Sequence, residues 1–183
     1  LYLRALEIQD KALGPINPQI AISLNNLGGL YQAQKSYSKA DAFYRRALKI
    51  RQKSLGPEHP DTAASINNLA SLHNAQGLHG KAETLLQRAL EIQERTLGVA
   101  HLDIAATLNN LAYTHQVRGE YSEARRLYER SLSIQKSFNS DNLDTAIILS
   151  NLADSYYAEK MHGKAESTLK NGLNTELLLI QRE

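Results

Sequence analysis

The stretch Ile66-Asn67-Asn68-Leu69-Ala70 decides the fold, because it recurs along the chain at a fixed interval. It returns as Leu108-Asn109-Asn110-Leu111-Ala112, occurs earlier as Leu24-Asn25-Asn26-Leu27-Gly28, and appears last as Ser150-Asn151-Leu152-Ala153. The interval is 42 residues from Asn26 to Asn68, 42 from Asn68 to Asn110 and 41 from Asn110 to Asn151. A fixed period of this length predicts a repeat array.

The composition favours an all-α protein. Hydrophobic residues make up 42% of the 183 positions, which is enough for a substantial core, and only 4 prolines and 10 glycines interrupt the chain. Cysteine is absent, which excludes a disulfide framework and a thiolate site and is typical of the cytoplasm. The net charge of +2 predicts no nucleic-acid surface, and no apolar run or leader predicts a membrane segment. Because Leu1 lies in mid-pattern, we interpret the chain as a window from a longer protein.

Each repeat reads as two helices separated by short turns. Gly14-Pro15 and Gly56-Pro57 combine a left-handed helix end with a helix start, and Asn139 takes the place of Gly at the fourth junction. Asp61, Asp103 and Asp144 fall in the first helical turn, where the dipole favours a carboxylate. We predict first helices at 18–34, 60–76, 102–118 and 143–159, and second helices at 37–55, 79–97, 121–138 and 163–180. The single repeat domain then divides into a truncated second helix at 1–14 and repeats at 15–56, 57–98, 99–139 and 140–183, the last ending either in a capping helix or at the edge of a further repeat.

Small residues recur where paired helices must touch. They occupy three equivalent places in each repeat, and bulkier side chains follow the second of them, which predicts closely crossing helices. The small residues are Gly28, Ala70, Ala112 and Ala153, then Ala40, Ala82, Ala124 and Ala165, then Ala47, Ala89, Ser131 and Gly172; the bulkier ones are Tyr44, Leu86, Tyr128 and Leu169.

This packing code resembles the tetratricopeptide repeat, whose standard length is about 34 residues. The 42-residue period, the Leu-Asn-Asn-Leu-Ala stretch and the Leu-Gly-Pro-Glu-His-Pro-Asp junction at 55–61 are similar to the kinesin-light-chain type. The resemblance implies a right-handed α-solenoid of antiparallel helix hairpins, in which the first helices line a concave groove for extended peptides. It also implies an adaptor role, although similar repeats occur in sensor regions of signalling ATPases.

A helical wheel indicates which residues would face a ligand. With about 100° per residue, Asn67, Asn68 and Ser71 share one face of their helix, and Ile66 and Leu69 lie on the opposite, buried face. Carboxamides both donate and accept hydrogen bonds, which suits a peptide backbone. We call the predicted ligand side of the four first helices the amide face; it comprises Asn25, Asn26, Gln32, Asn67, Asn68, Ser71, Asn74, Asn109, Asn110, Tyr113, Gln116, Asn151, Asp154 and Tyr157.

Two alternatives qualify this prediction. The Asn ladder can instead be structural, with each amide bonding to the neighbouring helix. We expect that role more for the second Asn of each pair and ligand contact more for the first. The amide face also lacks Lys and Arg, so we expect no clamp for a C-terminal carboxylate, which some tetratricopeptide domains have.

Neither the histidines nor the basic clusters indicate catalysis. His73, His79, His115 and His162 alternate with Tyr at equivalent positions, and His59 and His101 alternate with Asn, so packing or capping explains them. No metal-ligand, phosphate-loop or nucleophile motif is present. Two basic clusters lie on second helices beside acidic residues at helical spacing, which predicts a solvated outer face, with an acidic partner on that side as the alternative. They comprise Arg45, Arg46, Lys49, Arg51 and Lys53, near Asp41, and Arg125, Arg126 and Arg130, near Glu123 and Glu129.

We therefore expect a non-catalytic protein-interaction module without cofactor or metal, which binds a protein or peptide and neither nucleic acid nor membrane. The alternative is an architectural solenoid that self-associates through the open half-repeat at Leu1, and a third interpretation is the sensor region of a larger signalling ATPase.

Overall fold

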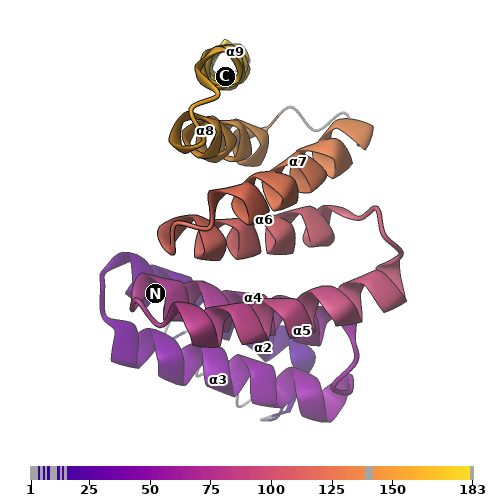
Figure 1. Ribbon diagram of the computed structural model, residues 1–183. Helices are drawn as coiled ribbons and strands as arrows, with labels where there is room; N and C mark the ends of the chain where they lie inside the picture. Colours follow the sequence, from indigo (N-terminus) through magenta and orange to yellow (C-terminus); the bar gives the residue numbers. More distant parts are fainter. Residues whose placement is uncertain are drawn as a thin grey trace. The chain divides into compact units, whose positions relative to one another are not determined.

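A computed structural model describes Arg4, Leu6, Ile8, Ala12 and Gly14, and then residues 16–138 and 142–181. Within this part of the chain there are eight long α helices and no strand (Figure 1). The bounds of all eight agree with the predicted ranges to within one residue. The helices are α2 (Pro18–Ala33), α3 (Tyr37–Ser54), α4 (Pro60–Ala75), α5 (His79–Leu97), α6 (Leu102–Val117), α7 (Tyr121–Ser137), α8 (Leu143–Ala158) and α9 (His162–Ile180).

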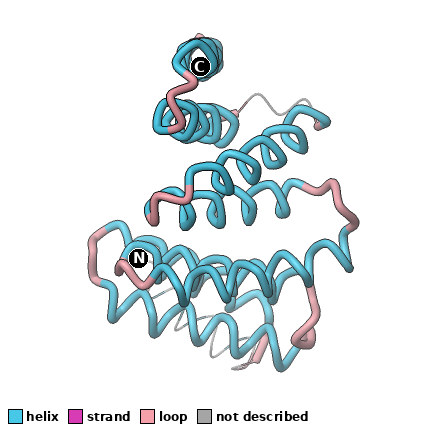
Figure 2. The backbone as a smooth tube through the Cα atoms, in the orientation of Figure 1, coloured by secondary structure: helices cyan, strands magenta, loops and turns pink. Residues whose placement is uncertain are grey.

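The chain divides into two compact units, Leu1–Leu97 and Gly98–Glu183. The first unit contains α2 to α5 and the second α6 to α9, and in each of them consecutive helices pair as hairpins joined by short turns (Figure 2). Most of the leading half-repeat and its Leu1 end lie outside the described residues. Leu6 of that segment is 5% exposed and packs with Ile20, Leu24 and Ile50.

Each first helix begins at a side-chain cap. The Oδ1 atom of Asn17 accepts the amide of Gln19 at 2.9 Å, and that of Asn142 accepts the amide of Thr145 at 2.9 Å. In the two middle repeats the Nδ1 atoms of His59 and His101 do the same at 3.1 and 3.2 Å. These histidines cap helices, as their alternation with Asn predicts. The Asn139 junction lies outside the described residues.

The four hairpin turns share one geometry. The residue three positions after each first helix donates to a carbonyl five residues earlier, for example from Ser36 to Tyr31 at 2.8 Å and from Met161 to Tyr156 at 2.9 Å. This is the Schellman arrangement, and it places the preceding residue in the left-handed region. That residue is Gly77 or Gly119 in the middle repeats, and it is Lys35 (φ 56°) or Lys160 (φ 61°) in the outer two.

The small residues lie buried at the helix crossings, as predicted. Gly28 has no room for a larger side chain, since a Cβ built there would lie 2.5 Å from the Tyr44 ring. Tyr44, Leu86 and Tyr128 fill the space beside the crossings and are at most 5% exposed. Leu169 differs, because it is 46% exposed on α9, where no described helix follows to cover it.

None of the described helices is both long enough and apolar enough to cross a membrane.

The amide face and a cavity between first helices

The amide face lies on α2, α4, α6 and α8, and its residues differ in exposure. Four are exposed, namely Asn26, Tyr113, Asp154 and Tyr157. Asn74 is buried. The others are half-buried: Asn25, Gln32, Asn67, Asn68, Ser71, Asn109, Asn110, Gln116 and Asn151.

In the first unit, part of this face holds neighbouring first helices together. The Nδ2 atom of Asn25 donates to Oγ of Ser65 at 3.2 Å, and Nε2 of Gln32 donates to Oγ of Ser71 at 3.2 Å. Both bonds join α2 to α4. In the α2 pair it is therefore the first Asn that contacts a neighbour, while Asn26 is exposed. A wheel drawn for one helix does not show on which side the next first helix lies.

In α2, α4 and α6 a polar contact joins the last turn of the first helix to its own hairpin partner. Asn74 is 9% exposed, and its Oδ1 lies 3.2 Å from Nδ1 of His79 on α5. The Tyr128 hydroxyl donates to Oε1 of Gln116 at 2.7 Å, and burial raises the pKa of Tyr128. Tyr44 donates to Gln32 in the same way at 3.1 Å, so these polar groups tie first helix to second.

A cavity of about 350 Å³ opens in the second unit between the N-terminal halves of α6 and α8. Its walls carry Asn109 of the amide face, and its lining includes Gln135 of α7. Gln135 is 3% exposed, and Oε1 of Gln135 and Oδ1 of Asn109 are buried atoms without a hydrogen-bond partner. The other lining residues are Leu102, Asp103, Ala106, Asn110, Asn142, Asp144, Ile147 and Ile148.

Gln135 lies on a second helix, so a helical wheel of the first helices does not include it. A signal was nevertheless present in the repeat alignment. Its equivalents at the 42-residue period are Gln93 and Arg51, so one buried position carries either an amide or a guanidinium. A polar side chain at a core position of a repeat predicts a polar contact between helices.

Exposed apolar side chains accompany the amides. On α2, Ile22 is 53% and Leu30 is 43% exposed. On α8, Ile147 is 42% and Tyr157 is 67% exposed, and Tyr113 of α6 is 43% exposed. In each unit the first helices thus present apolar surface and amides together, a combination that suits an extended polypeptide.

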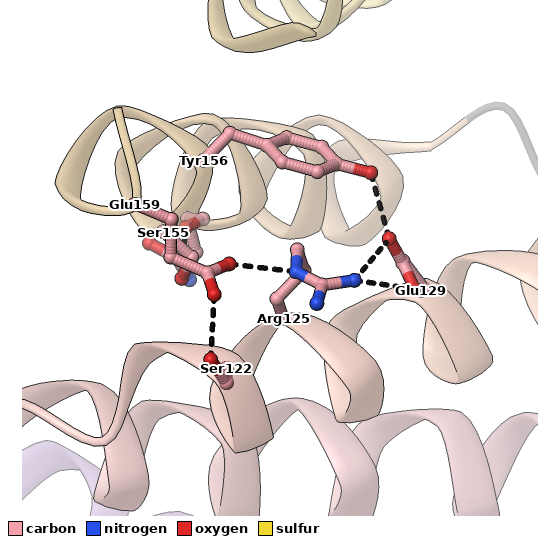
Figure 3. A network of polar contacts seen from close by, with 7 residues as sticks. Ser122, Arg125, Glu129, Ser155, Tyr156 and Glu159 are labelled. Atoms are coloured by element: carbon pink, nitrogen blue, oxygen red, sulfur yellow. Dashed lines mark hydrogen bonds and ion pairs between the residues drawn. The ribbon is translucent and has the colours of Figure 1, made fainter. Parts of the chain in front are cut away.

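A polar network holds α8 against α7 in the second unit (Figure 3). Arg125 donates through Nε to Glu159 at 2.7 Å and through Nη1 to Glu129 at 3.2 Å, and Ser122 also donates to Glu159. The hydroxyl of Tyr156 donates to Glu129 at 2.7 Å. Hydrogen bonds from Ser122 and Arg125 lower the pKa of Glu159, and burial followed by the Glu129 contact raises the pKa of Tyr156 to about 12.

The structure changes the interpretation of both basic clusters. Arg51 of the first was predicted on the solvated outer face, but it is 8% exposed and donates to the carbonyl oxygen of Asp61. Arg126 pairs with Glu123 on the exposed side of α7, as predicted. Arg125 instead points across the helix pair and is 25% exposed, because Glu159 at the end of α8 lies within its reach. Its role is to join two helices.

The remaining histidines have local partners. The Nδ1 atom of His115 lies 2.5 Å from Oε2 of Glu120, and that of His73 lies 3.2 Å from Oε1 of Gln76. The ring of His162 packs edge-on against the ring of Tyr157. Across the residues that the structure describes, no group of His, Asp or Glu has the arrangement of a metal site.

A family model described as tetratricopeptide repeat matches residues 1–53, 19–95 and 103–174. A sequence comparison with curated proteins gave no match. Among solved structures, BtubC (BKLC) from P. vanneervenii is 25% identical with a TM-score of 0.79, over 97% of this chain and 71% of that one.

Two further structures are similar. A putative kinesin light chain from Podosopora anserina, with nearly identical repeats of this type, is 28% identical with a TM-score of 0.68, over 96% of this chain and 83% of that one. A Rap protein complexed with competence and sporulation factor is 21% identical with a TM-score of 0.83, over 95% of this chain and 46% of that one. At that identity, the likeness to the Rap protein shows the fold alone.

Proposed function

Because the chain belongs to the tetratricopeptide repeat family, we propose that it is a protein-interaction module of the kinesin-light-chain type that holds an extended partner segment against the amide face. Repeats of this family serve protein–protein interaction and are generally non-catalytic. The finer assignment to the amide face, and with it an adaptor role, is the proposal.

The observation that carries the proposal is the mixture of exposed groups on the first helices. Asn26 and Tyr113 are exposed, and Asn109 has an oxygen without a hydrogen-bond partner. An extended backbone offers N–H and C=O groups that carboxamides can bind, and its side chains can cover Tyr113 and Tyr157. Asn25, Gln32 and Asn74 bond to neighbouring helices, so we assign them to support of the face.

The test uses a pool of random dodecapeptides and the chain with Tyr113 replaced by Ala. The matched control is Tyr121→Ala, because Tyr121 is a tyrosine of similar exposure, 37% against 43%, on second helix α7. We expect Tyr113→Ala to weaken peptide binding about tenfold, a typical loss for a contacting aromatic side chain, with an unchanged melting temperature. Tyr121→Ala should bind as the parent does.

Two results would count against the proposal. If no peptide in the pool binds the parent chain, the module does not recognise extended segments. If both tyrosine variants weaken binding equally, the contact lies elsewhere than on the amide face.

One observation favours the architectural alternative at the C-terminal end. Leu169, Leu173, Leu177 and Ile180 share one side of α9 and are 46–70% exposed. Such a row suits packing of a further helix, which a second copy of the chain can supply. Light scattering of the parent and of Leu173→Glu tests this: a dimer that the substitution dissociates supports self-association through α9, and a parent monomer opposes it.

A further inference from the structure

The cavity between α6 and α8 corresponds to a place that an arginine occupies in the first unit. Gln135 of α7 is the equivalent of Arg51 of α3 at twice the 42-residue period. Asn109 is likewise the equivalent of Asn25. Ile148 is the equivalent of Ser65 and Asp144 of Asp61, each 83 residues apart, because the last interval is 41 residues. The same four positions can therefore be compared in two separate hairpin pairs.

In the first unit, Arg51 fills this place with its own guanidinium. It is 8% exposed, and its Nη1 donates to the carbonyl oxygen of Asp61 at 2.7 Å and to Oγ of Ser65 at 3.1 Å. Ser65 also accepts from Asn25. The guanidinium thus joins α3 to the start of α4 beside the amide face.

In the second unit, the arginine and its hydroxyl partner are both missing. Gln135 is shorter and neutral, and Ile148 offers no hydroxyl where Ser65 stands in the first unit. What remains is the 350 Å³ cavity with the buried Oε1 atom of Gln135, which has no partner. The Oδ1 atom of Asn109 also has none, as is true of its equivalent in Asn25, so the Gln135 oxygen and the open volume distinguish the second unit. A volume of this size far exceeds the roughly 10–15 Å³ that one water needs, and a buried oxygen without a donor is costly.

The charges at the cavity select among ligands. Both unpartnered atoms are acceptors, and Asp103 and Asp144 are among the lining residues, with Oδ2 of Asp103 3.7 Å from Nδ1 of His101. Asp144 is exposed and forms no ion pair with any residue that the structure describes. An anion would meet two carboxylates, and an apolar group would leave both oxygens unsatisfied, whereas a cation with several N–H donors satisfies the site.

We propose that this cavity is a specificity subsite for an arginine side chain of the bound partner, whose guanidinium replaces the one that Arg51 supplies in the first unit. The subsite rests on the proposed function, since the arginine arrives on the segment that the amide face holds. Guanidinium is planar, permanently charged and rich in donors, so Gln135, Asn109 and the rim carboxylates can share its N–H groups.

The direct test is a nuclear magnetic resonance titration of the isotopically labelled chain with the capped tripeptide Ac-Ala-Arg-Ala-NH2. Its comparison peptides carry citrulline, which keeps the shape and loses the charge, or norleucine, which keeps only the apolar stem. We expect the arginine peptide to shift the side-chain amide signals of Asn109 and Gln135 and to bind at least about tenfold more tightly than the citrulline peptide. Equal shifts with all three peptides, or no shift at these two residues, would overturn the assignment.

A designed variant gives a second, independent readout. Gln135→Arg combined with Ile148→Ser recreates the arrangement of the first unit, so the chain's own arginine should fill the cavity. The variant should keep or raise the melting temperature and lose the response to the arginine peptide. A variant that folds and still responds as the parent does would show that the peptide binds elsewhere.

The matched experiment in the other unit is Arg51→Gln, which should create a second arginine-responsive site beside Asn25. Failure of the subsite and failure of the proposed function are distinguishable with the dodecapeptide pool. If pool peptides bind without preferring arginine, the function stands and the subsite falls; if none binds while the arginine tripeptide shifts Asn109 and Gln135, the subsite stands alone.

Discussion

Replacing Lys35 by Gly should stabilise the first unit, although it removes a whole side chain. Lys35 occupies the left-handed position of the first hairpin turn with φ of 56°, where Gly77 stands in the second turn at φ of 74°. Lys35 is exposed, so no packing is lost with its side chain. The change therefore isolates the backbone conformation of the turn.

The magnitude follows from two opposing contributions. A left-handed conformation costs a residue with a Cβ about 1–2 kcal/mol, and Gly removes that cost. Gly also gains conformational entropy in the unfolded chain, which offsets about 0.5–1 kcal/mol. The net gain in the free energy of unfolding is about 0.5–1 kcal/mol, or about 1–4 °C in melting temperature for a chain of this size.

The assay is urea unfolding followed by circular dichroism, with the reverse exchange Gly77→Lys as the matched control. A Cβ at Gly77 would have no heavy atom within 4 Å, so its effect is also confined to the backbone. Lys35→Gly should raise the urea midpoint and Gly77→Lys should lower it by a similar amount. Destabilisation by Lys35→Gly, or an unchanged midpoint in Gly77→Lys, would refute the reasoning.

Two further predictions concern packing and pH. Ala82→Leu enlarges a fully buried side chain at the helix crossing on α5 and should lower the free energy of unfolding by about 1–3 kcal/mol. Ala75→Leu, at the exposed end of α4, should be nearly neutral. Equal melting temperatures for the two variants would contradict the assigned packing. The pKa of Glu159 lies below its unfolded value of 4.5, so its ionised form stabilises the second unit above about pH 4.5, and that contribution is lost as the pH falls through the folded pKa. Glu159→Gln should therefore lower the melting temperature at neutral pH and reduce the decrease in melting temperature as the pH falls below about 4.5. Glu166→Gln, at an exposed position, should behave as the parent does. If the melting temperatures of the parent and Glu159→Gln change in parallel with pH, the role of the network is contradicted.

Much of the fold could be predicted because the information is local and repeated. Helix bounds follow from caps such as Asn17 and His59 and from the left-handed turn position, all within a few residues of the helix they end. The crossing residues followed from size alone, since only a small side chain such as Ala47 fits between two helix axes. Four copies of the same pattern made each assignment independent of any single residue.

The candidate site was less accessible to the same reasoning. The helical wheel showed which side of each first helix carries the amides, and it placed Asn74 and Asn26 on the same side, although Asn74 is buried and Asn26 is exposed. Asn74 is covered because the hairpin brings His79 over the last turn of α4. The cavity beside Gln135 could not be predicted, because its other lining residues come mainly from two other helices, α6 and α8.

The sequence by itself therefore determined that this is an array of helical hairpins, where each helix begins and ends, and which positions are small. The tertiary structure alone decided that Asn25 bonds to Ser65 while Asn26 is exposed. It also decided that Arg51 fills its place in the first unit, whereas the equivalent place beside Gln135 in the second unit is a cavity. The physical reason is the separation along the chain of the residues that interact. Periodicity and capping act within one or two helical turns, whereas a hydrogen-bond partner or an unfilled volume depends on side chains about 40 residues apart, and a change at any one of them alters the site.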